Sequence, residues 1–577
     1  MSRTPLLTAT SLVAAALVLS ACKPDAPAPV TAPSPEPTPA APEHAFTPAL
    51  SGEDFVAHVQ KLASDEFEGR APGSVGEEKT VEYLQAQFKR MGLQPGNGDS
   101  YLQNVPMVET TADPSTVLTL EVKGQPRELK FGTDMVVGTR TAQPEVKLEG
   151  SDLVFVGYGV NAPELKWNDY AGVDVKGKTV VMFVNDPGFH AQDEKLFEGK
   201  RMTYYGRWTY KYEEAARQGA AAALLIHDPA GASYGWEVVR NGWVGPQFDL
   251  RVSDDPDPRL PVQGWITNDV ARQLMKDLGQ DLDALLAAAG KPGFKAVPLQ
   301  AKASVALKST IAEKSSHNVV AKLPGAKRPN EAIVYMAHWD HLGNKAHEGH
   351  GDAPAGGEDH IYNGAIDNAT GVAGILEIAE AFSKQTPPPD RSVVFLAVTL
   401  EESGLLGSKY YVAHPSIPLA NTVGVINLDA MPVIGKARDM TVVGKGNSQL
   451  EDLLKKFTDI QGRVLTAETT PQDGFYFRSD HFNFAKAGVP ALYAKGGDDL
   501  IEGGTDAGRQ ANEDYRDLRY HKPSDAYDAG WKLEGVLQDL DALYNVGREL
   551  AASDQWPTWY DGNAFRAAQD KLRAERK

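Results

Sequence analysis

The sequence is poor in cysteine, in positive charge and in long apolar runs, and each shortage excludes a class of protein. Its single cysteine cannot form an internal disulfide, which excludes a fold held together by disulfide bridges. Its 58 lysines and arginines face 77 acidic residues, and the net charge is -19. Such a surface repels phosphate backbones, so we expect no nucleic acid partner. Beyond the N-terminus no run reaches the roughly 18 to 20 consecutive apolar residues of a transmembrane helix.

The N-terminus predicts export. Arg3 precedes the short apolar stretch "LLTATSLVAAALVLSAC", which ends in small residues as secretory signals do. The letters "LSAC" resemble the lipobox at which bacterial lipoproteins are cleaved and acylated, so residues 1–21 are expected to be a signal peptide and Cys22 the lipidation site. Residues 22–50 follow as a semi-rigid linker rich in proline and alanine. The expected location is the cell envelope, with a lipid on Cys22 anchoring the protein to a membrane that faces the periplasm or the cell exterior.

Residues 150–295 differ in pattern from the chain on either side. Glycine, proline and aspartate turns separate short apolar runs such as "DLVFVGYGV", "KTVVMFVND" and "AAAALLIHD". The pattern predicts a small β-rich domain inserted into a larger one, and it resembles the protease-associated domain found in several secreted peptidases. Its "GVDVKGKT" matches the P-loop expression but precedes a strand instead of opening a helix, so we interpret it as a hairpin turn and expect no nucleotide.

The segments that flank the insert are predicted to form one α/β domain. Residues 51–149 would be its first part and residues 305–552 its second, with 553–577 as a C-terminal tail. In the second part, helical stretches alternate with the apolar runs "AIVYMAH", "SVVFLAVTLEE", "TVGVINLDA" and "GVPALYA". Strands that are apolar on both faces and separated by helices predict a mixed, largely parallel sheet flanked by helices.

Potential metal ligands follow three of these strands. His338 with Asp340, the pair Glu401 and Glu402, and Asp429 each come at a strand end. Ligand crevices in open α/β sheets lie at the carboxyl ends of the strands, so we expect these side chains to converge. A single histidine or aspartate at such a position is usually a turn or capping residue, and it is their number that favours a site.

Asp367 and His521 lie in loops and complete the candidate set. Histidine and carboxylate ligands suit zinc, while the single cysteine excludes a thiolate site. Three ligating carboxylates and a bridging hydroxide carry four negative charges, which would balance two divalent cations. We therefore expect two zinc ions as the cofactor.

The motifs resemble one peptidase family in both content and order. They are "AHWDHLG", "IYNGAIDNATG", "TLEESGLLGS", "NLDA", "RSDHFNFAKAGVPAL" and "YHKPSD". As a set they are similar to metallopeptidase family 28, the di-zinc exopeptidases that include secreted bacterial aminopeptidases, and the likeness covers roughly residues 51–550. The resemblance implies that one zinc is held by His338, Asp367 and Asp429 and the other by Asp367, Glu402 and His521, with Asp367 bridging.

The resemblance also implies roles beside the metals. Glu401 would be the general base, and Asp340 would accept a hydrogen bond from His338 and so fix its tautomer. Neighbouring residues of a strand point to opposite faces, so the backbone must turn for Glu401 and Glu402 both to reach the site. The glycine at 404 is consistent with such a turn.

The expected function is the release of N-terminal residues from peptide substrates, with Asp480 and Tyr520 in the wall of the substrate pocket. One alternative is a carboxypeptidase resembling glutamate carboxypeptidase, which needs cations to hold a terminal carboxylate. The candidates for that task are Arg201, Arg207 and Arg478. Another alternative is a non-catalytic tethered binding protein on the same fold, which predicts missing ligands.

Further histidines lie between the first two ligands, at positions 341, 347, 350 and 360. The stretch is rich in glycine, which favours a mobile loop with solvated histidines. A third metal site is the alternative interpretation.

Overall fold

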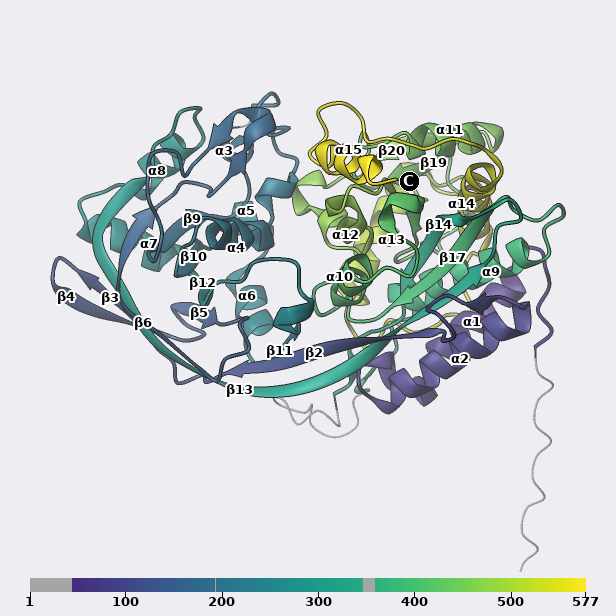
Figure 1. Ribbon diagram of the computed structural model, residues 1–577, viewed down its shortest axis with the longest axis horizontal. Helices are drawn as coiled ribbons and strands as arrows, with labels where there is room; N and C mark the ends of the chain where they lie inside the picture. The colour runs from purple at the N-terminus through teal and green to yellow at the C-terminus, as the bar shows by residue number, and fades with distance from the viewer. Residues whose placement is uncertain (1–43, 192, 346–358, 577) are drawn as a thin grey trace, which may run out of the picture. The chain divides into compact units, whose positions relative to one another are not determined.

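The computed structural model describes residues 44–191, 193–345 and 359–576 (Figure 1). The predicted signal peptide, Cys22 and most of the predicted linker lie outside these residues, as do His347 and His350. Within the described residues no helix is both long enough and apolar enough to cross a membrane. The fold given below is that of the unit that begins at Ala45.

The larger of two sheets runs in the order β11-β2-β13-β17-β14-β18-β21-β19-β20. Its strands are β11 (Pro246–Leu250), β2 (Leu102–Ala112), β13 (Val297–Leu323), β17 (Arg391–Val398), β14 (Arg328–His338), β18 (Thr422–Asn427), β21 (Ala491–Gly496), β19 (Asp439–Val442) and β20 (Val464–Ala467). The central strands β17, β14, β18 and β21 are parallel, whereas β11, β2 and β13 pair in antiparallel fashion. The predicted mixed sheet, with a parallel centre and flanking helices, is confirmed.

Helices cover both faces of this sheet because its central strands are apolar on both sides. In β14, for example, Ile333 belongs to one hydrophobic core and Val334 to another. The first core takes in α1 (Gly52–Leu62), α2 (Val75–Met91), α9 (Thr370–Ser383), α11 (Leu450–Ile460) and α14 (Glu534–Ala552), and the second takes in α10 (Leu406–Ala413) and α12 (His481–Lys486). The segment predicted as a tail also packs here, because Trp559 is fully buried in the second core and α15 (Arg566–Ala574) follows it.

Local sequence signals fix the ends of these helices. The hydroxyl of Ser74 accepts hydrogen bonds from the first N–H groups of α2. The same helix ends at Gly92, whose φ of 80° lies in the left-handed region that glycine adopts without strain. These two residues therefore determine where α2 begins and ends.

A second lobe is built on its own sheet, in the order β4-β3-β13-β6-β9-β10-β12-β5. The additional strands are β4 (Gln125–Lys130), β3 (Val117–Val122), β6 (Glu145–Phe155), β9 (Thr179–Phe183), β10 (Ala222–Ile226), β12 (Val262–Ile266) and β5 (Met135–Gly138), and the helices include α4 (Trp208–Arg217), α7 (Asn268–Asp277) and α8 (Leu282–Ala289). The lobe is thus an α/β structure and is less purely β than predicted. Its core also takes in Leu118 and Leu120 of β3, upstream of the predicted boundary at residue 150. Buried residues alternate with more exposed ones in β3, and β4 is mostly polar, so no continuous apolar run reveals either strand.

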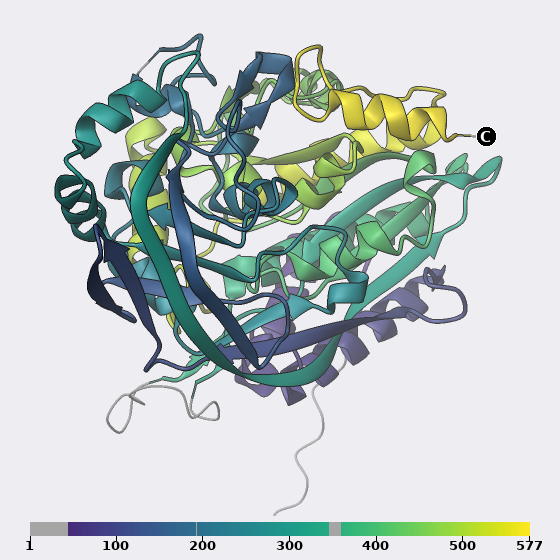
Figure 2. The same cartoon turned by 60° about the vertical axis from the view of Figure 1, so that its left-hand side comes forward.

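One strand belongs to both sheets. The 27 residues of β13 pair with β6 near their start and with β17 near their end. Both views show β13 curving from one lobe to the other (Figure 1, Figure 2). At roughly 3.3 Å per residue a strand of this length spans about 90 Å, so the two lobes share a continuous backbone support.

Candidate metal centre

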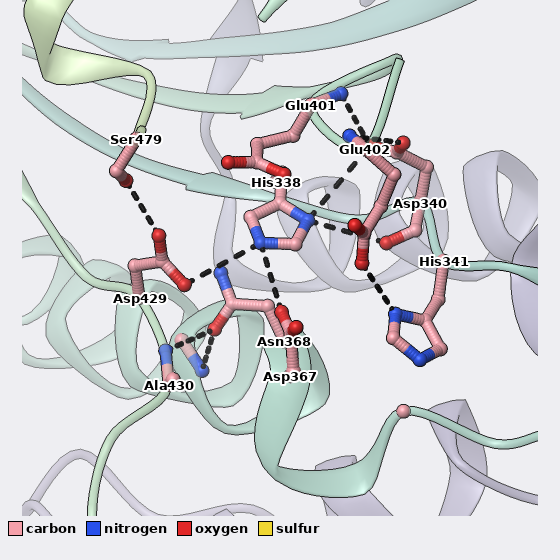
Figure 3. A network of polar contacts seen from close by, with 12 residues as sticks. His338, Asp340, His341, Asp367, Asn368, Glu401, Glu402, Asp429, Ala430 and Ser479 are labelled. Carbon is pink, nitrogen blue, oxygen red and sulfur yellow. Dashed lines mark hydrogen bonds and ion pairs between the residues drawn. The ribbon is translucent and has the colours of Figure 1, made fainter. Parts of the chain in front are cut away.

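Three parallel strands bring the predicted ligands to one edge of the larger sheet. His338 is the last residue of β14, Glu401 and Glu402 follow β17, and Asp429 follows β18. The backbone turns at Leu400, which has a φ of 57°, and again at Gly404, with a φ of 103°. The predicted turn after β17 is confirmed, and the side chains of Glu401 and Glu402 both reach the site (Figure 3).

The first group of candidate ligands surrounds His338. Its Nε2 atom lies 3.2 Å from Oδ1 of Asp367 and 3.5 Å from Oδ1 of Asp429. Ser479 donates a hydrogen bond of 2.5 Å to the other oxygen of Asp429 (Figure 3). One oxygen of Asp429 therefore remains directed towards His338.

The second group surrounds His521. Its Nε2 atom lies 3.3 Å from Oδ2 of Asp367 and 3.1 Å from Oε2 of Glu402. Asp367 thus offers one oxygen to each group, as a bridging ligand would. Two ligand atoms of a tetrahedral zinc ion, at bond lengths of about 2.0 to 2.1 Å, lie roughly 3.3 Å apart. The separations in both groups fit this geometry, so the five residues match the donor set that two zinc ions require.

The electrostatics of the centre also fit a cation. Burial alone would lower the pKa of His521, but its contacts with Asp367 and Glu402 raise it to about 10. The pKa of His338 is likewise raised well above its ordinary value despite burial, because Glu401, Asp367 and Asp429 surround it. This concentration of negative charge attracts protons and metal ions alike.

The two neighbouring glutamates differ in their electrostatics. Burial raises the pKa of Glu401 well above its ordinary range, and the charges of Glu402 and Asp429 raise it further. Burial and Asp367 also oppose the ionisation of Glu402, but hydrogen bonds with His341 and His521 lower its pKa to about 2. Glu402 is therefore the stronger candidate for a metal-binding anion, and Glu401 for a group that accepts and returns a proton.

Asp340 is fully buried beside the centre, but its contacts differ from those predicted. Its carboxylate accepts hydrogen bonds from the backbone N–H groups of Glu401 at 3.2 Å and Glu402 at 3.4 Å. The Nδ1 atom of His338 lies 3.8 Å from this carboxylate and 3.2 Å from the backbone oxygen of Asp340. Because the turn after β17 occupies the carboxylate, it is the carbonyl of Asp340 that lies within hydrogen-bond distance of His338 (Figure 3).

Two residues without a predicted role hold the segment around Asp367 in place. The two oxygens of Asp525 accept hydrogen bonds, each of 3.0 Å, from the backbone N–H groups of Ile366 and Asp367. Arg70 is buried, and its guanidinium donates to four backbone oxygens, those of Leu62, Trp339, Asn363 and Gly364. It thus joins the loop after His338 to the loop that carries Asp367. Asp525 closes the quoted motif "YHKPSD" and could have been noticed there, whereas no local signal marks Arg70.

His341 does not behave as a solvated loop residue, and that prediction is wrong for this position. The side chain is buried, with 1% of the residue exposed, and its Nδ1 lies 2.7 Å from Oε1 of Glu402 (Figure 3). Its backbone N–H donates to the carbonyl of Arg70 at 3.3 Å, which fixes the loop at this point. His360 is partly exposed.

The residues predicted to form the wall of the substrate pocket lie in different surroundings. Tyr520 is 41% exposed, stacks on His521 with 3.9 Å between ring centroids, and lines the cleft described next. Asp480 is fully buried and accepts a hydrogen bond of 2.6 Å from Ser408. Only Tyr520 of the two reaches the cleft surface.

A cleft of about 790 Å³ separates the metal centre from the second lobe, and Glu401 and Glu402 lie in its wall. Most cations along the cleft are paired: Arg140 with Asp249, Arg259 with Asp255, Lys409 with Asp255 and Asp257, and Lys486 with Glu213 and Asp257. Arg207 and Arg478 also line it, and their Nε atoms are buried without a hydrogen-bond partner among the described residues. Arg201 lines a separate cavity of about 210 Å³ and pairs with Glu198 and Glu468.

A family model matches the part of the chain that holds the candidate ligands, and known proteins resemble parts of the chain. Residues 318–542, which include all five candidate ligands, match the family model described as Peptidase family M28. Leupeptin-inactivating enzyme 1 of Streptomyces exfoliatus is 31% identical over 177 residues, 30% of this chain and 35% of that protein. A probable zinc metalloprotease of Pyricularia oryzae is 37% identical over 112 residues, 19% of this chain and 20% of that protein.

The extent of these likenesses is limited. The chain spans between 20% and 35% of the length of these two curated relatives. An aminopeptidase from Aneurinibacillus sp. strain AM-1 has a solved structure whose alignment covers 88% of this chain and 95% of that chain, with 22% identity and a TM-score of 0.48.

Proposed function

Starting from the peptidase family M28 domain at residues 318–542, we propose that the protein is a di-zinc exopeptidase that releases N-terminal residues from peptides. The observation that carries the proposal is the position of Asp367, whose two oxygens face two different histidine and carboxylate groups. One ion would be held by His338, Asp367 and Asp429, and the other by Asp367, Glu402 and His521. The same arrangement argues against a binding protein that has lost its ligands.

The residues of the chain divide the reaction between them. Bound zinc ions would supply Lewis-acid activation of a water molecule and of the scissile carbonyl. The Glu401 carboxylate takes a proton from the attacking water and returns it to the nitrogen of the leaving amine, so that it ends the cycle unprotonated. The excess of acidic residues in the chain, 77 against 58 lysines and arginines, favours the free ammonium group of an N-terminus.

The variant Glu401→Gln tests the assignment of the base. Because the amide cannot accept the proton, we expect kcat for aminoacyl-nitroanilides to fall about 10²-fold to 10⁴-fold. Zinc content, measured by atomic absorption, should remain that of the wild type, because Glu401 is not a ligand in the proposal. Glu149→Gln at an exposed site of the second lobe is the control and should match the wild type in both measurements. Retained activity in Glu401→Gln with zinc bound would refute the role of Glu401.

A carboxypeptidase is the second candidate, and the pair Arg207 and Arg478 favours it. Arg207 and Arg478 both line the cleft, and burial, followed by the charge of Arg478, lowers the pKa of Arg207 to about 9. Two arginines without an acidic partner among the described residues suit a carboxylate of the substrate. Arg201 is a weaker candidate, since it already pairs with Glu198 and Glu468.

A peptide panel separates the two candidates. An aminopeptidase should cleave C-amidated dipeptides and leave N-acetylated ones intact, and a carboxypeptidase should do the reverse. Replacing both Arg207 and Arg478 by methionine should raise KM about 10-fold to 100-fold for peptides with a free terminal carboxylate and leave amidated peptides unaffected. Equal effects on both kinds of peptide would remove the arginines from substrate recognition. A chelator should abolish every activity in the panel.

We also propose an envelope location, with the chain tethered by a lipid on Cys22. The proposal is supported by the apolar N-terminal stretch and the position of the single cysteine. Membrane fractionation of cells that express the full chain or Cys22→Ser tests it. The wild type should sediment with membranes, and equal distribution of the two proteins would contradict the tether.

A further inference from the structure

We infer that His341 is a positioning residue for the metal ligand Glu402. In this role the Nδ1–H group of His341 donates a hydrogen bond to one carboxylate oxygen of Glu402, Oε1. The other oxygen, Oε2, then remains directed at the proposed metal position that His521 also faces. The inference rests on the proposed function, because it assigns Glu402 to a metal. His341 lies close to residues of the proposed centre. His341, Asp367 and Glu402 each offer a ligand atom, and these atoms lie within 4.8 Å of one another.

Distances separate the ligands from the positioning residue. The Nε2 atoms of His338 and His521 lie 3.1 to 3.5 Å from the carboxylate oxygens that they face, which matches the edge of a zinc tetrahedron, roughly 3.3 Å. The Nδ1 atom of His341 lies only 2.7 Å from Oε1 of Glu402, which is the length of a charge-assisted hydrogen bond. Two atoms at that separation share a proton more readily than a metal ion.

Hydrogen bonding also fixes the tautomer. The Nε2 atom of His341 is buried and has no hydrogen-bond partner in the described part of the chain, whereas Nδ1 faces a carboxylate. A carboxylate accepts and does not donate, so the proton of the imidazole belongs on Nδ1. The Nδ1 atom then has no lone pair to offer to a metal, so any metal contact of His341 would have to come from Nε2.

The surrounding backbone holds the ring in this orientation. The ring lies against Gly364, where an added Cβ would come within 2.6 Å of two ring carbons. It also meets His521 edge to face, with 5.7 Å between centroids and an interplanar angle of 71°. Side chains that orient ligands from outside the coordination shell affect metal affinity about 10-fold to 100-fold.

The test compares His341→Ala with His341→Asn in the full chain. Asparagine places an N–H donor close to the position of Nδ1, while alanine removes the donor. The dissociation constant of Zn²⁺ is measured by competition with a chromophoric chelator, and the visible spectrum of Co²⁺ reports the ligand set. We expect alanine to weaken zinc binding at the site of Glu402 and His521 10-fold to 100-fold and asparagine to restore it to within about threefold of the wild type. The Co²⁺ spectrum of His341→Asn should match that of the wild type.

Other results overturn the inference in distinct ways. If His341→Asn weakens zinc binding as much as His341→Ala does and also changes the Co²⁺ spectrum, His341 is itself a ligand. If alanine leaves zinc affinity unchanged, His341 does not position Glu402. His414→Asn, at an exposed histidine of the same lobe, controls for general effects of the substitution, and circular dichroism confirms that each variant is folded. Failure of the wild type to bind two zinc ions would instead refute the proposed function.

Discussion

Both lobes place acids and histidines after the strands of a parallel sheet, but they use them differently. In the second lobe Asp186 follows β9, and His227 and Asp228 follow β10. Asp228 accepts hydrogen bonds from the backbone N–H groups of Ala230 and Gly231 and pairs with His190. Its charge is therefore compensated by partners in the same lobe.

The metal centre shows the opposite arrangement. The Nε2 atoms of His338 and His521 face carboxylates on distant segments, and Asp367 faces both histidines. Polar residues at strand ends are therefore not sufficient to identify a site. The distinguishing feature is that carboxylates from several segments converge and leave oxygen atoms directed at a common position.

The largest expected effect on activity comes from a test that replaces one acidic residue in each lobe by asparagine. Asp367→Asn replaces one of the two ligating oxygens by an amide nitrogen, so kcat/KM should fall on the order of 10³-fold or more and the bound zinc should decrease. Asp228→Asn keeps a good helix cap and should stay within about threefold of the wild type. Peptidase assays with metal analysis check both variants. Equal losses in the two would show that strand-end acids of either lobe serve the same purpose.

The next effect concerns the stability of the loops at the centre. Arg70→Met leaves four buried backbone oxygens without their donor, and we expect the free energy of unfolding to fall by roughly 3 kcal/mol. Burial lowers the pKa of Arg70 to about 10, so the side chain is still charged at neutral pH. Urea denaturation of the wild type and of Arg240→Met, an exposed arginine of the second lobe, provides the reference. A change as small as that of the control would mean that water replaces the lost donor.

The smallest effect tests the ion pairs that connect the lobes. Lys486 pairs with Glu213 at 3.1 Å and with Asp257 at 3.0 Å, and Lys409 also contacts Asp257, at 2.9 Å. Because Lys409 remains, Lys486→Met should cost only about 1 to 2 kcal/mol.

The pH dependence of the stability that Lys486→Met loses follows from the ionisation of Asp257. Burial opposes its ionisation, but Lys486 and Lys409 lower its pKa below the ordinary range. A lowered pKa means that the contribution is complete above about pH 4 and is lost as the pH falls further. Denaturant unfolding from pH 8 to pH 3 should therefore show a constant difference between the two proteins that shrinks only below about pH 4. A difference that disappears near pH 6 would assign the cost to another group.

Sequence patterns predict strands whose residues are buried without interruption. They do not predict contacts between residues that lie far apart in the sequence. The apolar runs of β14, β17 and β18 reveal strands buried on both faces, and the residues after them could be placed at one edge. Asp367 and His521 lie in loops, and their roles came from the family resemblance. Arg70 acts through carbonyls up to 294 positions away, which no local pattern records.

Sequence also misjudged features that depend on local backbone geometry. The glycine-rich composition after His338 suggested solvent exposure for His341, but contacts with Arg70 and Glu402 bury it. Strands β3 and β4 lack a continuous apolar run, and their pairing with β13 and with each other defines them.

The shared strand β13 has a consequence for protein engineering. Deleting residues 150–295 as a cassette would remove β9, β10 and β12 together with the end of β6, the strand that pairs with the first half of β13. The bare edge left behind would present unpaired N–H and C=O groups, which recruit strands from other molecules. A shortened enzyme therefore needs its joint placed further along β13, where β2 and β17 still protect it.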